Sequence, residues 1–170
     1  MDPLSRRRLI LFAAAAFVVA SAAILIAWAF QLIGGYLPCP LCLEQRVPYY
    51  IGIPMTLLAI WLAAVGRVST PRVLLFGFAA VMAYGFYLGA YQAGAEWGFW
   101  PGPTDCATAD TSVRSAGSLL ETLNETRVVS CTEPALRVLG LSFAGWNAVV
   151  SALLVLIGLV GALGGRTRTR

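Results

Sequence analysis

Two cysteines separated by two residues, Cys39 and Cys42, are the residues in this chain best suited to chemistry. A thiolate is a strong nucleophile, and a Cys-x-x-Cys pair can alternate between a dithiol and a disulfide that closes a small ring. Closing so small a ring removes little entropy from the unfolded chain, so the bridge would add little stability. The pair therefore predicts a redox-active site rather than a structural crosslink.

A second pair of cysteines, Cys106 and Cys131, lies far downstream. For this pair a structural disulfide remains an alternative to a reactive one, because closing a loop of that length can stabilise a fold by roughly 3 kcal/mol. A zinc site built from all four thiols is a weaker alternative, since structural zinc ligands usually come in two close pairs. The chain also has no histidine, and we expect no metal site.

The segments that must position these cysteines are apolar enough to cross a membrane. Hydrophobic residues make up 59% of the 170-residue chain, charged residues make up 12%, and the mean hydropathy is +0.77. A water-soluble domain cannot cover so much apolar surface. The stretches that are long enough to span a bilayer as helices are residues 9–33, 48–65, 73–91 and 141–163. We therefore expect an all-α membrane protein, a four-transmembrane-helix bundle that forms one domain over residues 1–170.

The first of these stretches also has features of a cleavable signal peptide. A basic start is followed by an apolar run and by Ala20-Ser21-Ala22, which resembles a cleavage site. The apolar run, however, continues to Phe30, beyond the usual length of a signal's apolar core. We therefore expect this stretch to be retained as a span.

Arginines flank the predicted spans, and positive residues are enriched on the cytoplasmic side of a membrane protein. They occur at residues 6–8, at Arg67 and Arg72, and near the end of the chain at Arg166, Arg168 and Arg170. All of them predict that both termini are cytoplasmic and that the loops at residues 34–47 and 92–140 lie outside. The four cysteines then lie in these outside loops, where disulfides persist. This topology also accounts for the net charge of +4, so we expect no nucleic-acid partner.

Arg46 is the cationic residue that follows the Cys39–Cys42 pair most closely. If a helix begins near Leu43 or Glu44, Arg46 lies about one turn from Cys42, where a guanidinium favours the thiolate. The alternative is an arginine at the membrane interface that pairs with Glu44.

This four-span chain contains the segment Pro38-Cys39-Pro40-Leu41-Cys42-Leu43-Glu44-Gln45-Arg46 and the later segment Trp100-Pro101-Gly102-Pro103-Thr104-Asp105-Cys106. Cys131 and Trp146 follow these segments. Over nearly its whole length the chain resembles the disulfide-bond-forming protein B family, DsbB. The resemblance implies a protein of the bacterial inner membrane with periplasmic cysteine loops. It also implies that electrons pass from a periplasmic thioredoxin-like dithiol oxidase, DsbA, to a membrane quinone, either ubiquinone or menaquinone.

The resemblance also implies a role for each of these residues. The thiolate of the reduced partner attacks Cys106, and the released Cys131 attacks Cys39, which leaves Cys42 as a thiolate facing the quinone. Arg46 would stabilise charge on the thiolate and the quinone. Some relatives have a histidine near the outer end of the third span, where this chain has Gln92, which can donate a hydrogen bond but cannot deliver a proton. We expect Arg46 and Gln92 to bind the quinone, and the proton source stays open.

Other classes of function remain as alternatives. One is a thiol enzyme that reduces quinones in the manner of vitamin K epoxide reductases. Another is a non-enzymatic four-span scaffold whose disulfides are structural. Catalytic disulfides would accumulate as free thiols when quinone is withheld, whereas structural ones would stay oxidised.

Three further patterns make local predictions. An amphipathic helix is predicted within the long loop from the spacing of Val113, Ala116, Leu120 and Leu123. An aromatic belt at the membrane interface is predicted from Trp97, Phe99 and Trp100. A hydrogen bond between helices is predicted from Asn147, near the start of the last span.

Overall fold

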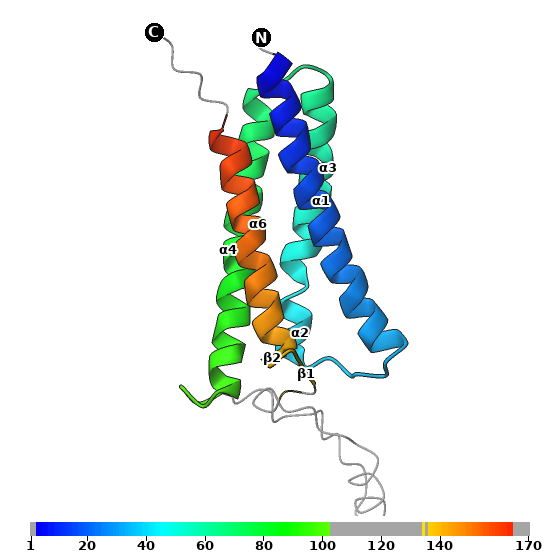
Figure 1. Cartoon of the computed structure of the whole chain (residues 1–170), viewed down its shortest axis with the longest axis vertical. Coiled ribbons are helices and arrows are strands. Elements are labelled where there is room, and N and C mark those ends of the chain that lie inside the picture. Colours follow the sequence, from blue (N-terminus) through cyan, green and yellow to red (C-terminus); the bar gives the residue numbers. More distant parts are fainter. Residues whose placement is uncertain (1–2, 103–133, 135, 165–170) are drawn as a thin grey trace, which may run out of the picture.

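The computed structural model describes residues 3–102, 134 and 136–164 (Figure 1). Its long helices are α1 (Pro3–Leu32), α3 (Val47–Ala64), α4 (Ser69–Glu96) and α6 (Phe143–Leu163). A short helix, α2 (Pro40–Glu44), leads directly into α3. The structure has four candidate membrane spans among the described residues: α1, α2 with α3, α4, and α6. The predicted fold class, an all-α four-helix membrane protein, is confirmed.

The second predicted span, residues 48–65, corresponds to α3, and a turn separates α3 from the short helix α2 that precedes it. Gln45 and Arg46 form a turn between Glu44 and Val47. Pro48, which follows, has no backbone N–H to donate to the carbonyl of Glu44, and its ring clashes with that carbonyl in a regular helix. Proline is well tolerated in the first turn of a helix, and here Pro48 lies at the start of α3. The break places Arg46 at the N-cap of α3 rather than within a helix.

The connection from α4 to α6 ends in a small antiparallel hairpin formed by β1 (Arg137–Val138) and β2 (Leu141–Ser142). Leu139 and Gly140 make the turn, and both have positive φ values, 52° and 85°. Two-residue hairpin turns often require positive φ at both positions. The Ser142 side chain then caps α6 by accepting a hydrogen bond from the backbone N–H of Gly145, so the hairpin leads directly into the last helix.

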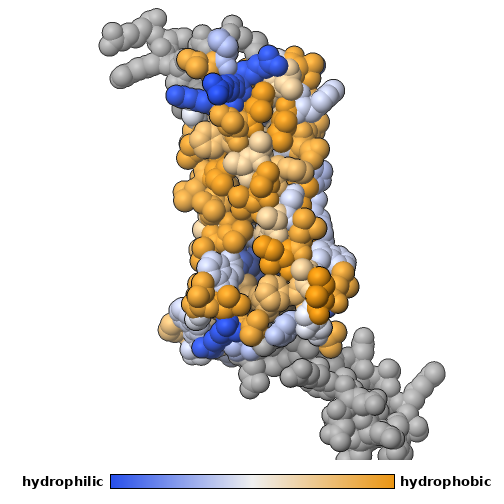
Figure 2. Space-filling model, turned by 45° about the vertical axis from the view of Figure 1, so that its right-hand side comes forward, coloured by the Kyte–Doolittle hydropathy of each residue, from blue (hydrophilic) through white to orange (hydrophobic). Residues whose placement is uncertain are grey.

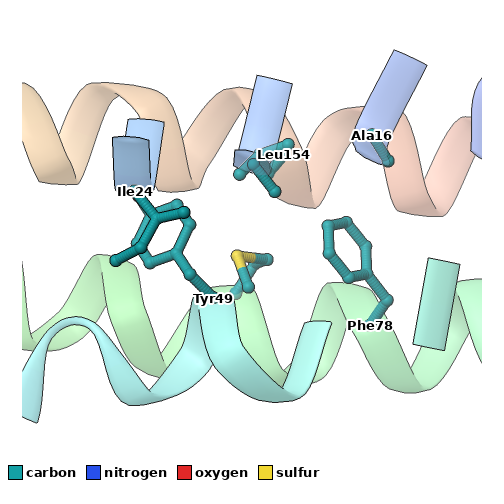
Figure 3. Packing of buried hydrophobic residues seen from close by; sticks show 7 residues of the cluster. Ala16, Ile24, Tyr49, Phe78 and Leu154 are labelled. Atoms are coloured by element: carbon teal, nitrogen blue, oxygen red, sulfur yellow. The ribbon is translucent and has the colours of Figure 1, made fainter. Parts of the chain in front are cut away.

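The centre of the bundle is a cluster to which all four long helices contribute (Figure 3). The α1 helix contributes the small residues Ala16 and Ala20 together with Ile24, which lets it approach its neighbours closely. The other members are Tyr49 from α3, Phe78 and Met82 from α4, and Leu154 from α6. Figure 2 shows apolar side chains covering the middle of the bundle's outer face, as a surface in contact with lipid requires.

Arg6 ties α1 to the end of α3. Its guanidinium donates to the backbone oxygens of Ala63 and Ala64, which are among the last carbonyls of α3. The Ala63 carbonyl also accepts from the backbone N–H of Gly66 in the turn after α3, and a cation near a helix C-terminus is stabilising. Arg6 therefore has a packing role in addition to the orientation that its charge predicts.

Gly89 allows α4 to pack closely against α6. A Cβ atom at this position would lie 2.9 Å from the backbone nitrogen of Ala148 and 3.1 Å from the oxygen of Ala144. These are backbone atoms, so the two helices would have to separate. We expect Gly89→Ala to lower the free energy of unfolding by about 1–3 kcal/mol, measured by denaturant titration in detergent.

Gly77→Ala is the matched control for this substitution. A Cβ at Gly77 would meet the terminal methyl of Met55 at 3.0 Å, and that flexible side chain can move aside. Both glycines lie in α4, so the effect on stability of replacing glycine by alanine in a helix is the same at the two positions. Equal destabilisation by the two substitutions would contradict the importance of the Gly89 contact.

Candidate functional site

Cys39 and Cys42 are joined by a disulfide where the loop after α1 enters α2. Cys39 is the N-cap residue of α2, and its Sγ accepts a hydrogen bond from the backbone N–H of Cys42 at 3.1 Å. Pro40 follows in the first turn, where its fixed φ suits a helix start. Cys39 is only 1% exposed, whereas Cys42 is partly exposed. The local sequence thus builds one helical turn around the disulfide and leaves Cys42 the more exposed residue of the pair.

The disulfide forms part of the wall of a cavity of about 380 Å³ at this end of the bundle. Apolar side chains from α1 and α6 make much of the lining, and Phe30 and Phe143 meet edge to face with ring centres 4.9 Å apart. Polar and charged side chains contribute as well, and these are Gln31, Gln45, Arg46, Gln92, Glu96 and Asn147. A mostly apolar cavity with a few polar groups is the usual form of a small-molecule site.

Arg46 lines the same cavity and is held there by α1. Its Nη1 donates to Oε1 of Gln31 at 2.6 Å, and its guanidinium carbon lies 5.7 Å from the centre of the Trp28 ring. The second contact has the geometry of a cation–π interaction. Within the described residues Arg46 forms no ion pair with Glu44, whose side chain is exposed. The structure thus pairs Arg46 with α1 in place of Glu44, while its role, in the quinone site or as an interfacial arginine, stays a prediction.

Gln92 lies in the last turns of α4, and its side chain is 4% exposed. Its Nε2 is 3.6 Å from the Sγ atoms of both Cys39 and Cys42. Its Oε1 accepts a hydrogen bond of 2.6 Å from Nε2 of Gln45. This second contact fixes the amide so that its N–H groups point toward the disulfide.

A chain of hydrogen bonds continues from Gln45 into the bundle. Asn147 donates from Nδ2 to Oε1 of Gln45 at 2.7 Å, and its Oδ1 accepts from the Tyr49 hydroxyl at 2.7 Å. The Tyr49 hydroxyl also lies 3.2 Å from that of Ser151. Asn147 Nδ2 also donates to the backbone oxygen of Gly85 in α4 at 3.4 Å, which confirms the prediction that Asn147 donates a hydrogen bond between helices. Linked hydrogen bonds in an apolar interior hold their members in one arrangement, so the disulfide is backed by a rigid polar network.

Reasoning from the sequence missed Gln45, Tyr49 and Glu96 as members of this region. Glu96 lines the cavity, and its Oε1 accepts a hydrogen bond of 3.4 Å from Nε2 of Gln92. Its Oε2 is buried and has no hydrogen-bond partner among the described residues. The four-residue spacing between Gln92 and Glu96 puts both on one helix face. That spacing would have identified Glu96 if the helix had been expected to continue beyond residue 91.

Other predictions concern the segments that flank this site. The rings of Trp97, Phe99 and Trp100 are exposed at the end of α4, and Trp100 stacks on Tyr91 with ring centres 6.0 Å apart. Their role as an interfacial belt stays a prediction. Cys106, Cys131 and the expected amphipathic helix near residues 113–123 lie outside the described residues.

Comparisons with known proteins confirm the predicted family. Residues 7–161 match the family model described as "Disulfide bond formation protein DsbB". The chain is also similar to "Uncharacterized protein RP370" of Rickettsia prowazekii (strain Madrid E), with 25% identity over 128 residues. That alignment covers 74% of this chain and 72% of the relative. No solved structure matches the chain significantly.

Proposed function

We propose that this chain, which belongs to the DsbB family, passes electrons from a periplasmic DsbA-like dithiol through two cysteine pairs to a membrane quinone. Membership in the family makes it a membrane thiol oxidoreductase that forms disulfide bonds. One observation carries the finer proposal: the Cys39–Cys42 disulfide lies in the wall of a mostly apolar cavity that Arg46 and Gln92 also line. Such a wall combines a reducible bond with hydrogen-bond donors.

The residues around the cavity fit a quinone. A quinone head group is a flat ring with two carbonyl oxygens, so it needs apolar walls and hydrogen-bond donors. Phe30 and Phe143 supply apolar surface, while Arg46 and Gln92 supply N–H donors. When bound, the quinone supplies an acceptor for two electrons and two protons. Both ubiquinone and menaquinone satisfy these requirements, and we propose that Arg46 and Gln92 hold the ring.

We assign different tasks to the two sulfurs of the disulfide. Cys42 is the more exposed of the two, so we assign it the position facing the quinone, where the Arg46 guanidinium favours its thiolate. Cys39 is the sulfur that exchanges with Cys131. Because Cys39 is 1% exposed, this exchange requires the loop before α2 to open. Cys106 accepts the partner's thiolate.

We also propose the orientation of the bundle in the bacterial inner membrane. The contact of Arg6 with the end of α3 brings the basic N-terminal segment close to the turn at Gly66 and Arg67. The disulfide and α2 lie at the opposite end of the bundle (Figure 1). Because positive flanks are retained inside, the disulfide end would face the periplasm and both termini the cytoplasm. We treat residues 1–170 as one membrane domain.

Trapping the partner tests the proposed electron path. In Cys131→Ala, Cys106 is a free thiol whose thiolate can attack the disulfide of the oxidised partner and release one of the partner's thiolates. No second thiol beside Cys106 is then left to displace the partner from the mixed disulfide. We expect this variant to accumulate a Cys106 adduct with a thioredoxin-like periplasmic protein, seen on non-reducing gels and assigned by mass spectrometry. The control is the double variant Cys106→Ala/Cys131→Ala, in which the adduct disappears. Absence of any adduct from an expressed Cys131→Ala variant would contradict the relay.

A further inference from the structure

We infer that Glu96 takes up a proton when the Cys39–Cys42 disulfide is reduced and holds that proton in the cavity for the reoxidation step. The inference deepens the proposed function and rests on it. It assigns a source for a proton in a chain that has no histidine.

The geometry places the Glu96 carboxyl group one side chain away from both sulfurs. Nε2 of Gln92 is 3.4 Å from Oε1 of Glu96 and 3.6 Å from each of the two Sγ atoms. Glu96 and both cysteines line the same cavity. A carboxyl group in this position can exchange a proton with a sulfur through water in the cavity that both groups line.

The second oxygen of Glu96 has the environment expected of a group that changes protonation. Oε2 is buried without a hydrogen-bond partner among the described residues. A negative charge on a buried oxygen without a partner is costly, and a proton on this oxygen would remove that cost. The hydrogen bond from Gln92 to Oε1 is long, at 3.4 Å, and the Ser142 hydroxyl also lies near the carboxylate.

The charges around Glu96 change when the disulfide is reduced. Arg46 lines the same cavity, and Arg137 of β1 is a second cation near the carboxylate. Tyr36 and Tyr49 are the tyrosines in the cavity wall. A thiolate at Cys42 would add a negative charge near Glu96, and a like charge favours the protonated form of a carboxyl group.

The proton and electron balance of the step is simple. An incoming dithiol reduces the disulfide: the Cys39–Cys42 bond breaks, and the dithiol becomes a disulfide. Of the two protons that the dithiol releases, one remains on Cys39 as a thiol and the other moves to the Glu96 carboxylate, while Cys42 is left as a thiolate. The total charge does not change. When the Cys39–Cys42 bond re-forms, the thiol and the carboxylic acid together hold the two protons that a quinone requires.

Infrared difference spectroscopy on quinone-free protein tests this inference without relying on quinone turnover. Chemical reduction of the disulfide should produce a carboxylic-acid C=O band in the parent protein. Glu96→Gln should lack the band, while its amide oxygen can still accept the hydrogen bond from Gln92. Cys42→Ser should also lose it, because no thiolate forms.

Glu44→Gln is the matched control, because Glu44 and Glu96 are the two carboxylates in the described part of the chain and Glu44 is exposed. It should keep the band. A band that persists in Glu96→Gln, or that never appears in the parent on reduction, would overturn the inference.

Quinone-reduction kinetics provide an independent test. We expect Glu96→Gln to lower kcat by about 100-fold, the scale of general acid–base catalysis, with little change in the KM for quinone. Since Glu96 must be ionised to accept a proton, the parent's rate should fall as the pH is lowered through its titration. That dependence should be absent from the variant. Kinetics of Glu96→Gln that match the parent at every pH would refute the role of Glu96. A parent that shows the band but reduces no quinone would refute the proposed function and leave proton uptake by Glu96 supported.

Discussion

Cys42→Ala should reduce the rate of quinone reduction by a dithiol substrate to the uncatalysed level, and Cys39→Ala should do the same. Loss of an essential nucleophile costs an enzyme roughly four orders of magnitude or more in rate. The two sulfurs act as a unit, because neither can form or release the Cys39–Cys42 bond alone. The measurement is quinone absorbance during turnover with a reduced dithiol protein, compared with the rate without enzyme.

These substitutions should have little effect on the fold. The ring closed by the disulfide is small, so the bond contributes little through the entropy of the unfolded chain, and the core cluster is built from residues of the four long helices. Denaturant titration of each variant separates lost chemistry from lost folding. Full activity in either folded variant would rule out the Cys39–Cys42 pair as the quinone-side dithiol.

Arg46→Met should lower quinone efficiency by roughly 100-fold. A hydrogen bond to a charged group contributes on the order of 1.5–3 kcal/mol, and the upper value corresponds to that factor in rate. Methionine keeps some of the packing of the arginine stem but removes the charge from the cavity that Arg46 and Cys42 both line. Arg46→Lys should lose less, because it keeps the charge without the planar guanidinium. The measurement is quinone-reduction kinetics over a range of quinone concentrations, and exchange at Cys106 should be nearly unaffected.

Gln31→Ala separates the charge of Arg46 from its role in holding α1. Arg46 donates to Gln31 and lies over Trp28. Arg46→Met could therefore lower the rate by loosening the packing of α1 and not by removing the charge. Gln31→Ala removes one of these contacts and keeps the guanidinium. We expect a loss of less than about 10-fold, since a neutral partner contributes only about 0.5–1.5 kcal/mol. If Gln31→Ala is as impaired as Arg46→Met, or if Arg46→Met equals the parent, the electrostatic role is wrong.

The sequence by itself determined the elements of the fold. The spans follow from apolar runs that must satisfy their backbone hydrogen bonds within a helix, and the structure has four such helices among the described residues. The sequence also predicted that Cys39 and Cys42 could form a disulfide, since one turn of the chain brings two cysteines at this spacing together in any fold. The prediction for Asn147 succeeded because a polar side chain in an apolar segment needs a partner.

Only the tertiary structure determined which side chains contact one another in the site. Arg46 contacts Gln31 and Trp28 in α1 rather than its neighbour Glu44, because residues two apart do not share a helix face and Pro48 breaks the helix at this point. Gln45 joins Gln92 and Asn147 across three segments distant in the sequence. Glu96 reaches the cavity because α4 continues past the apolar stretch. Hydropathy locates a span but does not set its rotation or the depth at which it packs, and those two quantities place side chains in the site.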